Sequence, residues 1–334
     1  MGQRVVISQL GATPMEAVDR FSEVLDQDAP IAGEGECVVK IESACVGWVD
    51  LIMAAGQYQH KPVPPYTPGM EFAGTIVGTG ERVVVDPFLT GVRTSGPYRQ
   101  WGGFASYALA PKQACIPIPD HFSFDEAANL LGNYETAVHC LITRGRLAAG
   151  ETVLIHGASG AVGLAAVHVA KLVGATVIAT GRSADKNAIV KAQGADHVIG
   201  TANLKDDVKA LTDGKGVDVV YDGVGGEISA LSLRAMKFGG RFLIVGWAAT
   251  PGQVNTLPTN LIMMKGIDVL GCPTVISTQH DPSIRPARLG QVMAWVRSGQ
   301  LKPLVARTYS LDEFRTAMHA KWNGETVGGI CLRP

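Results

Sequence analysis

ETVLIHGASGAVGLAAVHVAKLVG, residues 151–174, is the stretch of the chain that decides the fold. A short β-rich run, Thr152–His156, leads into a glycine-rich turn and then into a helix-length segment, Ala161–Val173. Glycine permits a tight turn and lets backbone N–H groups approach a pyrophosphate beside the positive end of a helix dipole. The GxxGxxG spacing could by itself be only a tight turn. Here it lies at a strand-to-helix junction, which is the context that a dinucleotide site requires.

Strand and helix patterns alternate around this loop, from about Phe124 onward. Short β-rich runs predict strands at Thr152–His156, Thr176–Thr180, His197–Ile199, Val217–Tyr221, Arg241–Val245 and Ile267–Leu270. Helices are predicted between them at Ala161–Val173, Ala184–Gln193, Leu204–Leu211 and Glu227–Phe238. This alternation predicts an α/β domain with a doubly wound parallel sheet covered by helices on both faces. Helices at Ala287–Ser298 and Leu311–Lys321 and a last strand at Gly328–Leu332 are predicted to follow.

The end of the second predicted strand indicates which dinucleotide binds. An NAD site places Asp or Glu there, about 20 residues after the glycines, to accept a hydrogen bond from the ribose 2′-hydroxyl. This chain has instead Gly181, Arg182 and Ser183, with Lys186 one helical turn later. Two cations and a hydroxyl suit the 2′-phosphate of NADPH. The alternative is that Arg182 and Lys186 are ordinary solvated residues at a helix start.

The first part of the chain has a different texture. Short apolar stretches bounded by Gly and Pro predict antiparallel β structure of a barrel-like kind. They are Cys37–Ile41, Gly74–Val77, Arg82–Val85 and Phe104–Leu109. Prolines make Pro62–Gly69 a predicted rigid loop. We therefore expect two domains, residues 1–124 completed by residues 300–334, and residues 125–299.

Composition argues against several classes of protein. The 334 residues carry 29 basic and 30 acidic side chains, so no excess of positive charge favours nucleic acid or an anionic membrane. No apolar run reaches the length of a membrane span, and the N-terminus lacks the pattern of a signal peptide. The six cysteines form no CxxC pair, so we expect free thiols in a soluble, cytoplasmic protein.

Several segments together resemble the quinone oxidoreductase branch of the medium-chain dehydrogenase/reductase superfamily. They are HGASGAVG (156–163), GADHVI (194–199), VDVVYDGVGG (217–226), GGRFLIVGW (239–247), TNLIMMKG (259–266), PGMEFAGTIV (68–77) and GGFASYALAP (102–111). The resemblance covers almost the whole chain, in the family's order. It implies a GroES-like β-barrel domain with a Rossmann dinucleotide domain inserted. It also implies a homodimer joined through the edge strand of the Rossmann domain, about Gly266–Cys272, and an exposed apolar edge strand is a ready pairing surface.

The same resemblance implies that a catalytic zinc site is missing. Sister alcohol dehydrogenases hold zinc with a Cys, a His beside a Glu, and a second Cys or Asp. The matching positions here are Gly47, Met70 beside Glu71, and Gly132. Two glycines and a thioether cannot make a zinc site with three protein ligands, so we expect no metal. Cys45 is the tempting substitute ligand, but a buried structural cysteine is the favoured interpretation.

Without metal or a flavin motif, the expected chemistry is direct hydride transfer to a conjugated electrophile. Candidate catalytic residues are Tyr58, which the resemblance places at the cleft, Trp48 and Tyr134. Tyr58 could instead be a core-edge aromatic. Tyr134 and Thr136 resemble the family segment flanking the nicotinamide, and either could instead pack or cap a helix start. Family quinone reductases usually carry Asn where Gly47 precedes Trp48, which indicates a reshaped substrate pocket.

The remaining candidates would bind the cofactor. Trp247 and Asn260 are expected on the nicotinamide half; the alternative for Asn260 is that it caps the following helix. His156 is interpreted as a structural histidine rather than an acid. The full set expected to bind NADPH is Thr136, Gly157, Ser159, Gly160, Ala161, Val162, Gly163, Gly181, Arg182, Ser183, Lys186, Gly246, Trp247 and Asn260.

The leading hypothesis is a zinc-free, NADPH-dependent reductase of quinones or related activated alkenes. A second is an enoyl-thioester reductase, which would need a basic patch for an acyl-CoA or acyl-carrier substrate. The candidates for that patch are Arg93, Arg99, Arg285 and Arg288. A third is a non-catalytic NADPH-binding redox sensor.

Overall fold

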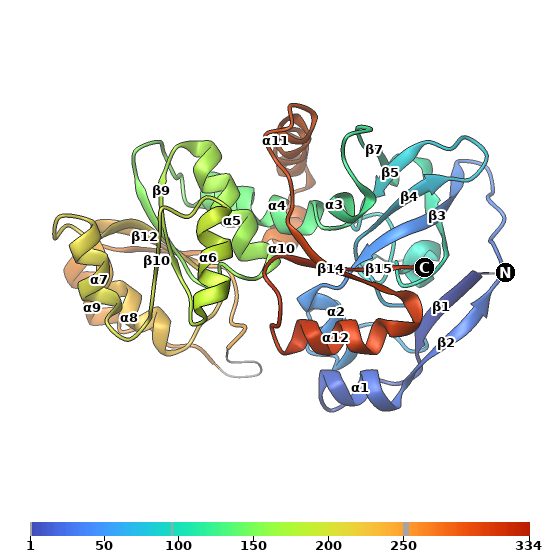
Figure 1. Cartoon of the computed structure of the whole chain (residues 1–334), viewed down its shortest axis with the longest axis horizontal. Coiled ribbons are helices and arrows are strands. Elements are labelled where there is room, and N and C mark those ends of the chain that lie inside the picture. The colour runs from blue at the N-terminus through green and yellow to red at the C-terminus, as the bar shows by residue number, and fades with distance from the viewer. Residues whose placement is uncertain (1, 95, 250–253) are drawn as a thin grey trace. The chain divides into compact units, whose positions relative to one another are not determined.

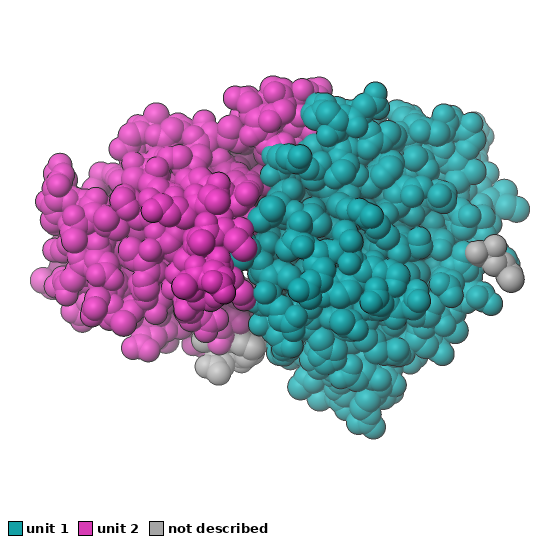
Figure 2. Space-filling model, viewed as in Figure 1, with its two compact units in different colours: residues 1–132, 302–334 teal, residues 133–301 magenta. Residues whose placement is uncertain are grey.

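The structure is a computed structural model that describes residues 2–94, 96–249 and 254–334. The chain divides into two compact units, residues 1–132 with 302–334 (unit 1) and residues 133–301 (unit 2) (Figures 1 and 2). No helix in the described ranges is long and apolar enough to cross a membrane.

Unit 2 is built on a six-stranded, wholly parallel sheet in the order β10-β9-β8-β11-β12-β13. Its strands are β8 (Thr152–Ile155), β9 (Thr176–Thr180), β10 (His197–Ile199), β11 (Val217–Asp222), β12 (Met236–Ile244) and β13 (Asp268–Gly271). The alternating helices are α5 (Ala161–Val173), α6 (Ala184–Ala192), α7 (Leu204–Leu211), α8 (Glu227–Ala235) and α9 (Thr259–Lys265). This order confirms the predicted doubly wound sheet.

Further helices precede β8 or follow β13 in the sequence. They are α4 (Leu131–Val138), the π-helix η3 (His139–Arg144), α10 (Thr274–His280), the 3-10 helix η4 (Pro282–Ile284) and α11 (Arg285–Arg297). The helix predicted at Glu227–Phe238 is too long. It ends at Ala235, because Met236 is buried and pairs with Val217 as the first residue of β12.

Unit 1 contains a seven-strand antiparallel-rich sheet and a separate hairpin of β1 (Gly2–Ile7) and β2 (Ser22–Gln27). The sheet runs β14-β15-β3-β4-β5-β7, with β6 paired to β3. Its strands are β3 (Glu36–Cys45), β4 (Phe72–Ile76), β5 (Arg82–Val85), β6 (Tyr107–Pro111), β7 (Cys115–Pro117), β14 (Val305–Ser310) and β15 (Gly329–Arg333). The C-terminal strand β15 therefore lies directly beside β3.

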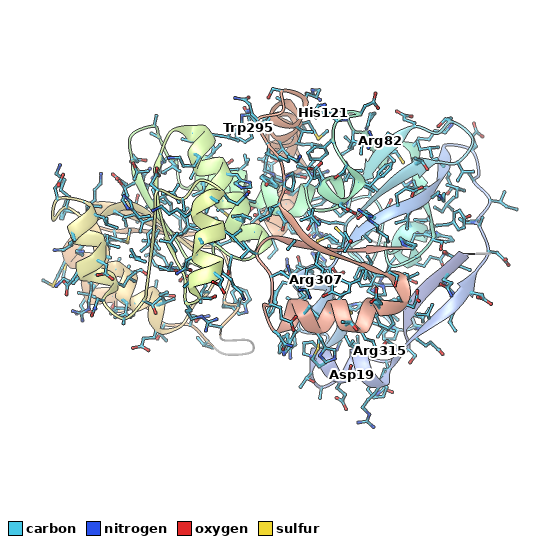
Figure 3. The ribbon with its side chains drawn as sticks, viewed as in Figure 1. Asp19, Arg82, His121, Trp295, Arg307 and Arg315 are labelled. Carbon is cyan, nitrogen blue, oxygen red and sulfur yellow. The ribbon has the colours of Figure 1, made fainter. Side chains whose placement is uncertain are left out.

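Short helices connect these strands. They are α1 (Pro14–Arg20), α2 (Trp48–Ala54), η1 (Pro97–Gln100), η2 (Lys112–Ala114), α3 (Phe124–Ala128), η5 (Leu311–Glu313) and α12 (Phe314–Trp322). α12 is tied to the N-terminal part of the unit: Arg315 donates to the Val18 carbonyl (3.1 Å) and His319 contacts Asp19 (2.8 Å). Arg315 and Asp19 are labelled in Figure 3.

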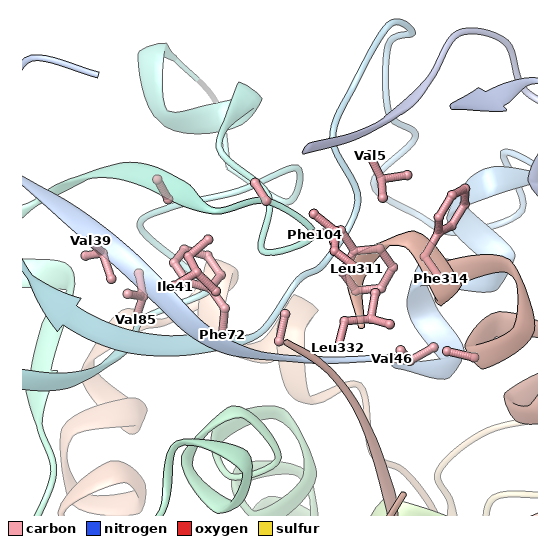
Figure 4. Packing of buried hydrophobic residues seen from close by; sticks show 14 of the residues in the cluster. Val5, Val39, Ile41, Val46, Phe72, Val85, Phe104, Leu311, Phe314 and Leu332 are labelled. Carbon is pink, nitrogen blue, oxygen red and sulfur yellow. The ribbon is translucent and has the colours of Figure 1, made fainter. Parts of the chain in front are cut away.

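The core of unit 1 lies between the sheet and the segments around it. Alternate residues of β3, Val39 and Ile41, point inward with Phe72 of β4 and Leu332 of β15, and all four are almost fully buried (Figure 4). Burying an aliphatic or aromatic side chain contributes about 1.5–3 kcal/mol. This core fixes the ends of β3 and β4, from which the candidate residues of unit 1 project.

Candidate functional site

The glycine loop joins β8 to α5 in the conformation that the sequence predicts. Gly157 has φ +67°, and Gly160 is the N-cap residue of α5 with no side-chain cap. A Cβ added at Gly163 would lie 2.1 Å from the Gly157 carbonyl oxygen, so only glycine lets the first turn of α5 pack on the loop. Ser159, Ala161 and Val162 occupy the same turn. First-turn N–H groups have no intrahelical acceptor, so this turn can hold an anion.

The basic pair lies at the end of the neighbouring strand, β9. The Gly181 N–H donates to the Ile199 carbonyl (3.0 Å), and Ser183 is the N-cap residue of α6. Arg182 is exposed and Lys186 is half-buried one turn into α6. Because β8 and β9 are adjacent parallel strands, the glycine loop and these cations both lie at the carboxyl end of the sheet. A Cβ at Gly181 would collide with Asn187, a neighbour that sequence reasoning missed.

The loop after β12 lies at the same carboxyl end of the sheet. Gly246 follows that strand, and Trp247 is 55% exposed. The Ala249 N–H donates to the Val224 carbonyl of the loop after β11 (2.9 Å). Val224 in turn lies next to the glycine loop, since a Cβ on Gly157 would be 3.3 Å from its Cγ2. The structure thus brings the residues predicted after β8 and β12 together at the carboxyl ends of the strands, where α/β sheets bind ligands.

Sequence reasoning missed the residue that shapes this end of the sheet, Asp222 at the end of β11. Its buried carboxylate accepts from the N–H groups of Val224 (2.9 Å) and Gly225 (3.0 Å) and from the Ser229 hydroxyl. An Asp followed by a glycine-rich turn is a signal for such an Asx turn and could have identified it.

Tyr134 and Thr136 lie inside α4 rather than at its cap. Tyr134 is 2% exposed, and its hydroxyl lies 2.7 Å from Nδ1 of His168, which contacts Gln193 through Nε2. This hydrogen bond agrees with the packing alternative for Tyr134. Thr136 is half-buried on the same helix.

Two other sequence interpretations concern Asn260 and His156. Asn260 is exposed within the first turn of α9, whose N-cap residue is Pro258, so the capping alternative is wrong. His156 is buried, with Nδ1 2.9 Å from the Thr180 hydroxyl and Nε2 2.6 Å from the Ser232 hydroxyl. Burial lowers the pKa of His156 to about 4, so the ring is neutral near pH 7, which is the behaviour of a structural histidine.

In unit 1, Asp50 organises the residues at the positions where zinc ligands are absent. Asp50 lies in the first turn of α2. Its Oδ2 accepts from the Gly47 N–H (2.9 Å), and Oδ1 accepts from the N–H groups of Gly69 (3.1 Å) and Met70 (3.0 Å). Burial raises the pKa of Asp50 to about 6, against these hydrogen bonds and Arg93, which lower it.

Arg93 lies against this group. Its Nη2 is 4.0 Å from the Met70 Sδ, and its charge lowers the pKa values of Asp50 and His60 and opposes the burial that raises the pKa of Tyr58. We call Asp50, Tyr58, His60, Met70 and Arg93 the Arg93 cluster. Arg93 Nε and His60 Nε2 are buried and have no hydrogen-bond partner among the described residues.

The surroundings of the Arg93 cluster are apolar. Met53, Ala54, Met70 and Val92 are buried together, with Tyr58 packed against them. Most of these residues come from α2 or from the loops before β4 and after β5. A few polar donors set among apolar side chains are typical of a small-molecule site.

Trp48, the remaining candidate of unit 1, is held by a partner that the sequence did not indicate. Its ring stacks on Trp322 at the end of α12, with 5.3 Å between centroids and 3° between planes. Such a pair is worth about 0.5–1.5 kcal/mol beyond burial. The stack fixes the start of α2 and therefore the position of Asp50.

The donors at the expected metal position do not fit zinc. A Cβ on Gly132 would lie 2.0 Å from Glu71 Oε1, so the structure brings positions 132 and 71 together. Gly47 and Gly132 offer no side chain, Met70 is a thioether, and both Asp50 oxygens accept from backbone N–H groups. Over the ranges described, no group of three or more His, Cys, Asp or Glu side chains is placed to hold a metal ion.

The four arginines named for a thioester substrate each have a partner within their own unit. Arg285 and Arg288 bind the buried Glu135 (2.9–3.1 Å), and Arg99 donates to the Lys61 carbonyl (3.0 Å). Arg93 belongs to the Arg93 cluster, with its Nη2 4.0 Å from the Met70 Sδ.

Comparison with known proteins agrees with this geometry. Residues 33–120 match the alcohol dehydrogenase GroES-like domain, and residues 161–282 match the zinc-binding dehydrogenase model. A quinone oxidoreductase-like protein 2 homolog from Nematostella vectensis is 32% identical over 98% of this chain and 88% of its own. The mouse quinone oxidoreductase is 32% identical over 86% of each chain. The Thermus thermophilus quinone oxidoreductase, solved also with NADPH, has TM-score 0.83 and 28% identity, covering 99% of this chain and 100% of its own.

A GroES-like β unit with a dinucleotide-binding parallel sheet defines a medium-chain dehydrogenase/reductase. Within that superfamily the chain belongs to the quinone oxidoreductase branch, and it is an oxidoreductase.

Proposed function

We propose that this protein is an NADPH-dependent oxidoreductase that reduces a quinone or another α,β-unsaturated carbonyl compound. Its relatives support the redox class, and the Thermus structure solved with NADPH supports the cofactor. One observation carries the acceptor side: the Arg93 cluster sets a cation with a buried, unpaired Nε, as far as the described residues show, among apolar side chains.

The carboxyl ends of the parallel strands in unit 2 would hold NADPH, which supplies a hydride when bound. The N–H groups from Gly157 to Gly163, with Ser159, Gly160, Ala161 and Val162 between them, would bind the pyrophosphate. The residues after β9, Gly181, Arg182, Ser183 and Lys186, would bind the 2′-phosphate, because cations and a hydroxyl stand where a carboxylate would repel it. Thr136, Gly246, Trp247 and Asn260 are proposed for the nicotinamide half.

The Arg93 guanidinium would stabilise the negative charge that develops on the acceptor oxygen. In a conjugated acceptor this charge is delocalised onto an oxygen, so a hydrogen-bond donor in an apolar site can do what a metal does for a simple ketone. Tyr58 is the proposed second donor. Burial raises the pKa of Tyr58, so its hydroxyl keeps its proton at neutral pH. Trp48 would border the acceptor, while Tyr134, bonded to His168, is not proposed as a donor.

The first test measures the oxidation of reduced nicotinamide, seen as loss of its absorbance, by protein that has been treated with a chelator. NADPH and NADH are compared with a 1,4-quinone, a 2-alkenal and a short enoyl-CoA. We expect turnover that survives chelation, prefers NADPH and favours the quinone or the alkenal. Preference for the enoyl-CoA would select the thioester reductase, and tight NADPH binding without turnover would select the redox sensor. Loss of turnover on chelation would contradict the zinc-free mechanism.

Variants of Arg93 test the acceptor site. A hydrogen bond to a charged group is worth about 1.5–3 kcal/mol, so Arg93→Gln is expected to lower kcat/KM for the acceptor about 10- to 100-fold. The KM for NADPH should be unchanged. Arg99→Gln removes a charge from the same loop and is the matched control. Equal kinetics of Arg93→Gln and wild type would refute the role of Arg93.

We also propose a homodimer formed through β13, the last strand of the parallel sheet. An edge strand has unpaired backbone groups on one side and favours pairing with a second copy. Light scattering should give a dimer for the wild type and a monomer for Val269→Lys. A monomeric wild type would refute this proposal.

A further inference from the structure

The six cysteines, scattered in the sequence, lie as three pairs in the structure. Cys37 and Cys115 have their Sγ atoms 3.0 Å apart. Cys45 and Cys331 are cross-strand neighbours that both hydrogen-bond Asn129 (3.0 Å each). Cys140 and Cys272 are hydrogen-bonded to each other. All six are free thiols.

Only one pair combines direct sulfur contact with access to solvent. Cys37 is buried, but Cys115 is half-exposed, whereas both members of the other two pairs are buried. The Asn129 amide bonds to both Cys45 and Cys331, so it satisfies those thiols separately. The Cys37–Cys115 separation is about 1 Å longer than a disulfide bond, so a small movement of the side chains would join them.

The fold brings Cys37 and Cys115 together through a local turn. β3 and β6 pair in register with Cys37 opposite Ala110. The short helix η2 follows β6 and turns the chain, and its Lys112 N–H donates to the Gly35 carbonyl (3.0 Å). β7 then begins at Cys115, which pairs with Val85 of β5. The contact is therefore set by the backbone of four strands, β3, β5, β6 and β7, and not by flexible side chains alone.

We propose that Cys37 and Cys115 form a reversible disulfide when the protein meets a peroxide. This modification site lies in unit 1 and is independent of the reductase activity proposed above. The hydrogen bond with Cys115 lowers the pKa of Cys37 against the effect of burial, whereas the same hydrogen bond, with burial, raises the pKa of Cys115, so Cys37 is the thiolate of the pair. Lys112 also favours the thiolate, while Glu36 and Glu81 oppose it.

The chemistry balances with hydrogen peroxide as the oxidant. One thiolate attacks a peroxide oxygen and breaks the O–O bond, giving a sulfenic acid and hydroxide, which takes up the released proton as water. The second sulfur attacks the sulfenic sulfur, so the S–S bond forms as the S–O bond breaks, and the departing hydroxide takes the proton of the second thiol and leaves as water. Two thiols lose two electrons and one peroxide gains them. A dithiol reductant reverses the oxidation by thiol–disulfide exchange.

Peptide mapping of the full-length protein tests the proposal. The reduced protein is treated with hydrogen peroxide, alkylated under denaturing conditions and digested without reductant. We expect a 37–115 cross-link that forms at least about tenfold faster than 45–331 or 140–272, because burial protects the other pairs. Dithiothreitol should restore six alkylated cysteines. Six alkylated cysteines throughout, irreversible oxidation, or a faster cross-link at another pair would overturn the proposal.

Variants make the assignment specific. Cys37→Ser and Cys115→Ser should each abolish the cross-link and leave a dimedone-reactive sulfenic acid on the remaining cysteine. Cys140→Ser is the matched control, because it removes a buried thiol from unit 2 and should leave the 37–115 cross-link unchanged. The wild-type map needs no variant, so a variant that fails to fold does not remove the test. NADPH oxidation assayed in parallel reports on the proposed reductase separately from the cross-link.

Discussion

Replacing Glu135 by Gln should destabilise α4 and α11 more than the loss of an exposed ion pair would. The Glu135 carboxylate is 3% exposed as a side chain and accepts from Arg285 Nη2 (2.9 Å), Arg285 Nε (3.1 Å) and Arg288 Nε (3.0 Å). The two arginines are three residues apart on α11, so both reach one carboxylate. Burial, followed by the nearby arginines, lowers the pKa of His139 to about 4, so that ring adds no charge at pH 7.

The size of the expected stability loss follows from the charges of Glu135, Arg285 and Arg288. Two guanidiniums share one carboxylate, so the buried group already carries an excess positive charge. Glu135→Gln removes the compensating charge and keeps the shape. Breaking a buried pair by removing one partner costs about 3–5 kcal/mol. Asp268→Asn is the matched control in the same unit. Its pair with Arg146 (3.3 Å) is exposed and should be worth less than about 1 kcal/mol.

Hydrogen exchange of peptides from α4 and α11 is the appropriate assay, because a two-unit chain need not unfold in one step. A loss of about 3–5 kcal/mol should accelerate exchange by about 10²- to 5 × 10³-fold where opening limits it. Replacing the carboxylate and both arginines together by apolar residues should recover much of this loss, since a buried ion cluster is often no better than an apolar one. Equal exchange rates in Glu135→Gln and Asp268→Asn would refute the reasoning.

Three further results are expected. Arg182→Ala and Lys186→Ala should each raise KM for NADPH about 10- to 100-fold and leave KM for NADH unchanged, by the strength of a charged hydrogen bond; an equal change for both cofactors would contradict the 2′-phosphate assignment. Gly163→Ala should weaken NADPH binding and lower Tm, because its Cβ would lie 2.1 Å from a backbone oxygen, whereas Gly160→Ala, at 3.4 Å, should be much milder. Unfolded His156 binds a proton near pH 6.5 and folded His156 only near 4, so its contribution to stability is present above pH 6.5 and is lost, by about 3 kcal/mol, as pH falls towards 4. His156→Asn should remove that part of the pH dependence of urea unfolding, and an unaltered pH profile would refute the pKa.

The sequence predicted the sheet of unit 2 because each strand and helix there carries its own periodic pattern and the glycine loop marks where they begin. β9, β10, α5 and α7 match their predicted bounds. The helix predicted to Phe238 was too long because Met236 is apolar in either pattern, and only pairing with Val217 decides for a strand. The intrinsic secondary-structure propensity of a residue does not account for such a tertiary contact.

Unit 1 was less predictable because its decisive contacts join distant segments. The positions of the Arg93 cluster depend on a loop after β5 and a loop before β4, and no local pattern relates Arg93 to Met70. The Trp48–Trp322 stack joins the two ends of unit 1. The same limit applies to Cys37 and Cys115, which lie 78 residues apart and share no local pattern that would predict their contact. Candidate residue types could be predicted there, but not their partners.

The assignment of acceptor and cofactor chemistry to separate residues has a kinetic consequence. Arg93 lies in unit 1 among apolar side chains, and Arg182 lies in unit 2 at the end of β9. An Arg93 variant should change acceptor kinetics without changing NADPH affinity, and an Arg182 variant should do the reverse. If both act independently, the two losses of rate should multiply when NADPH and the acceptor are both well below their KM values, because side chains without shared partners contribute additively to the free energy. A double variant no slower than the worse single variant would mean that the two residues act on one step together, and the separate roles proposed for them would be wrong.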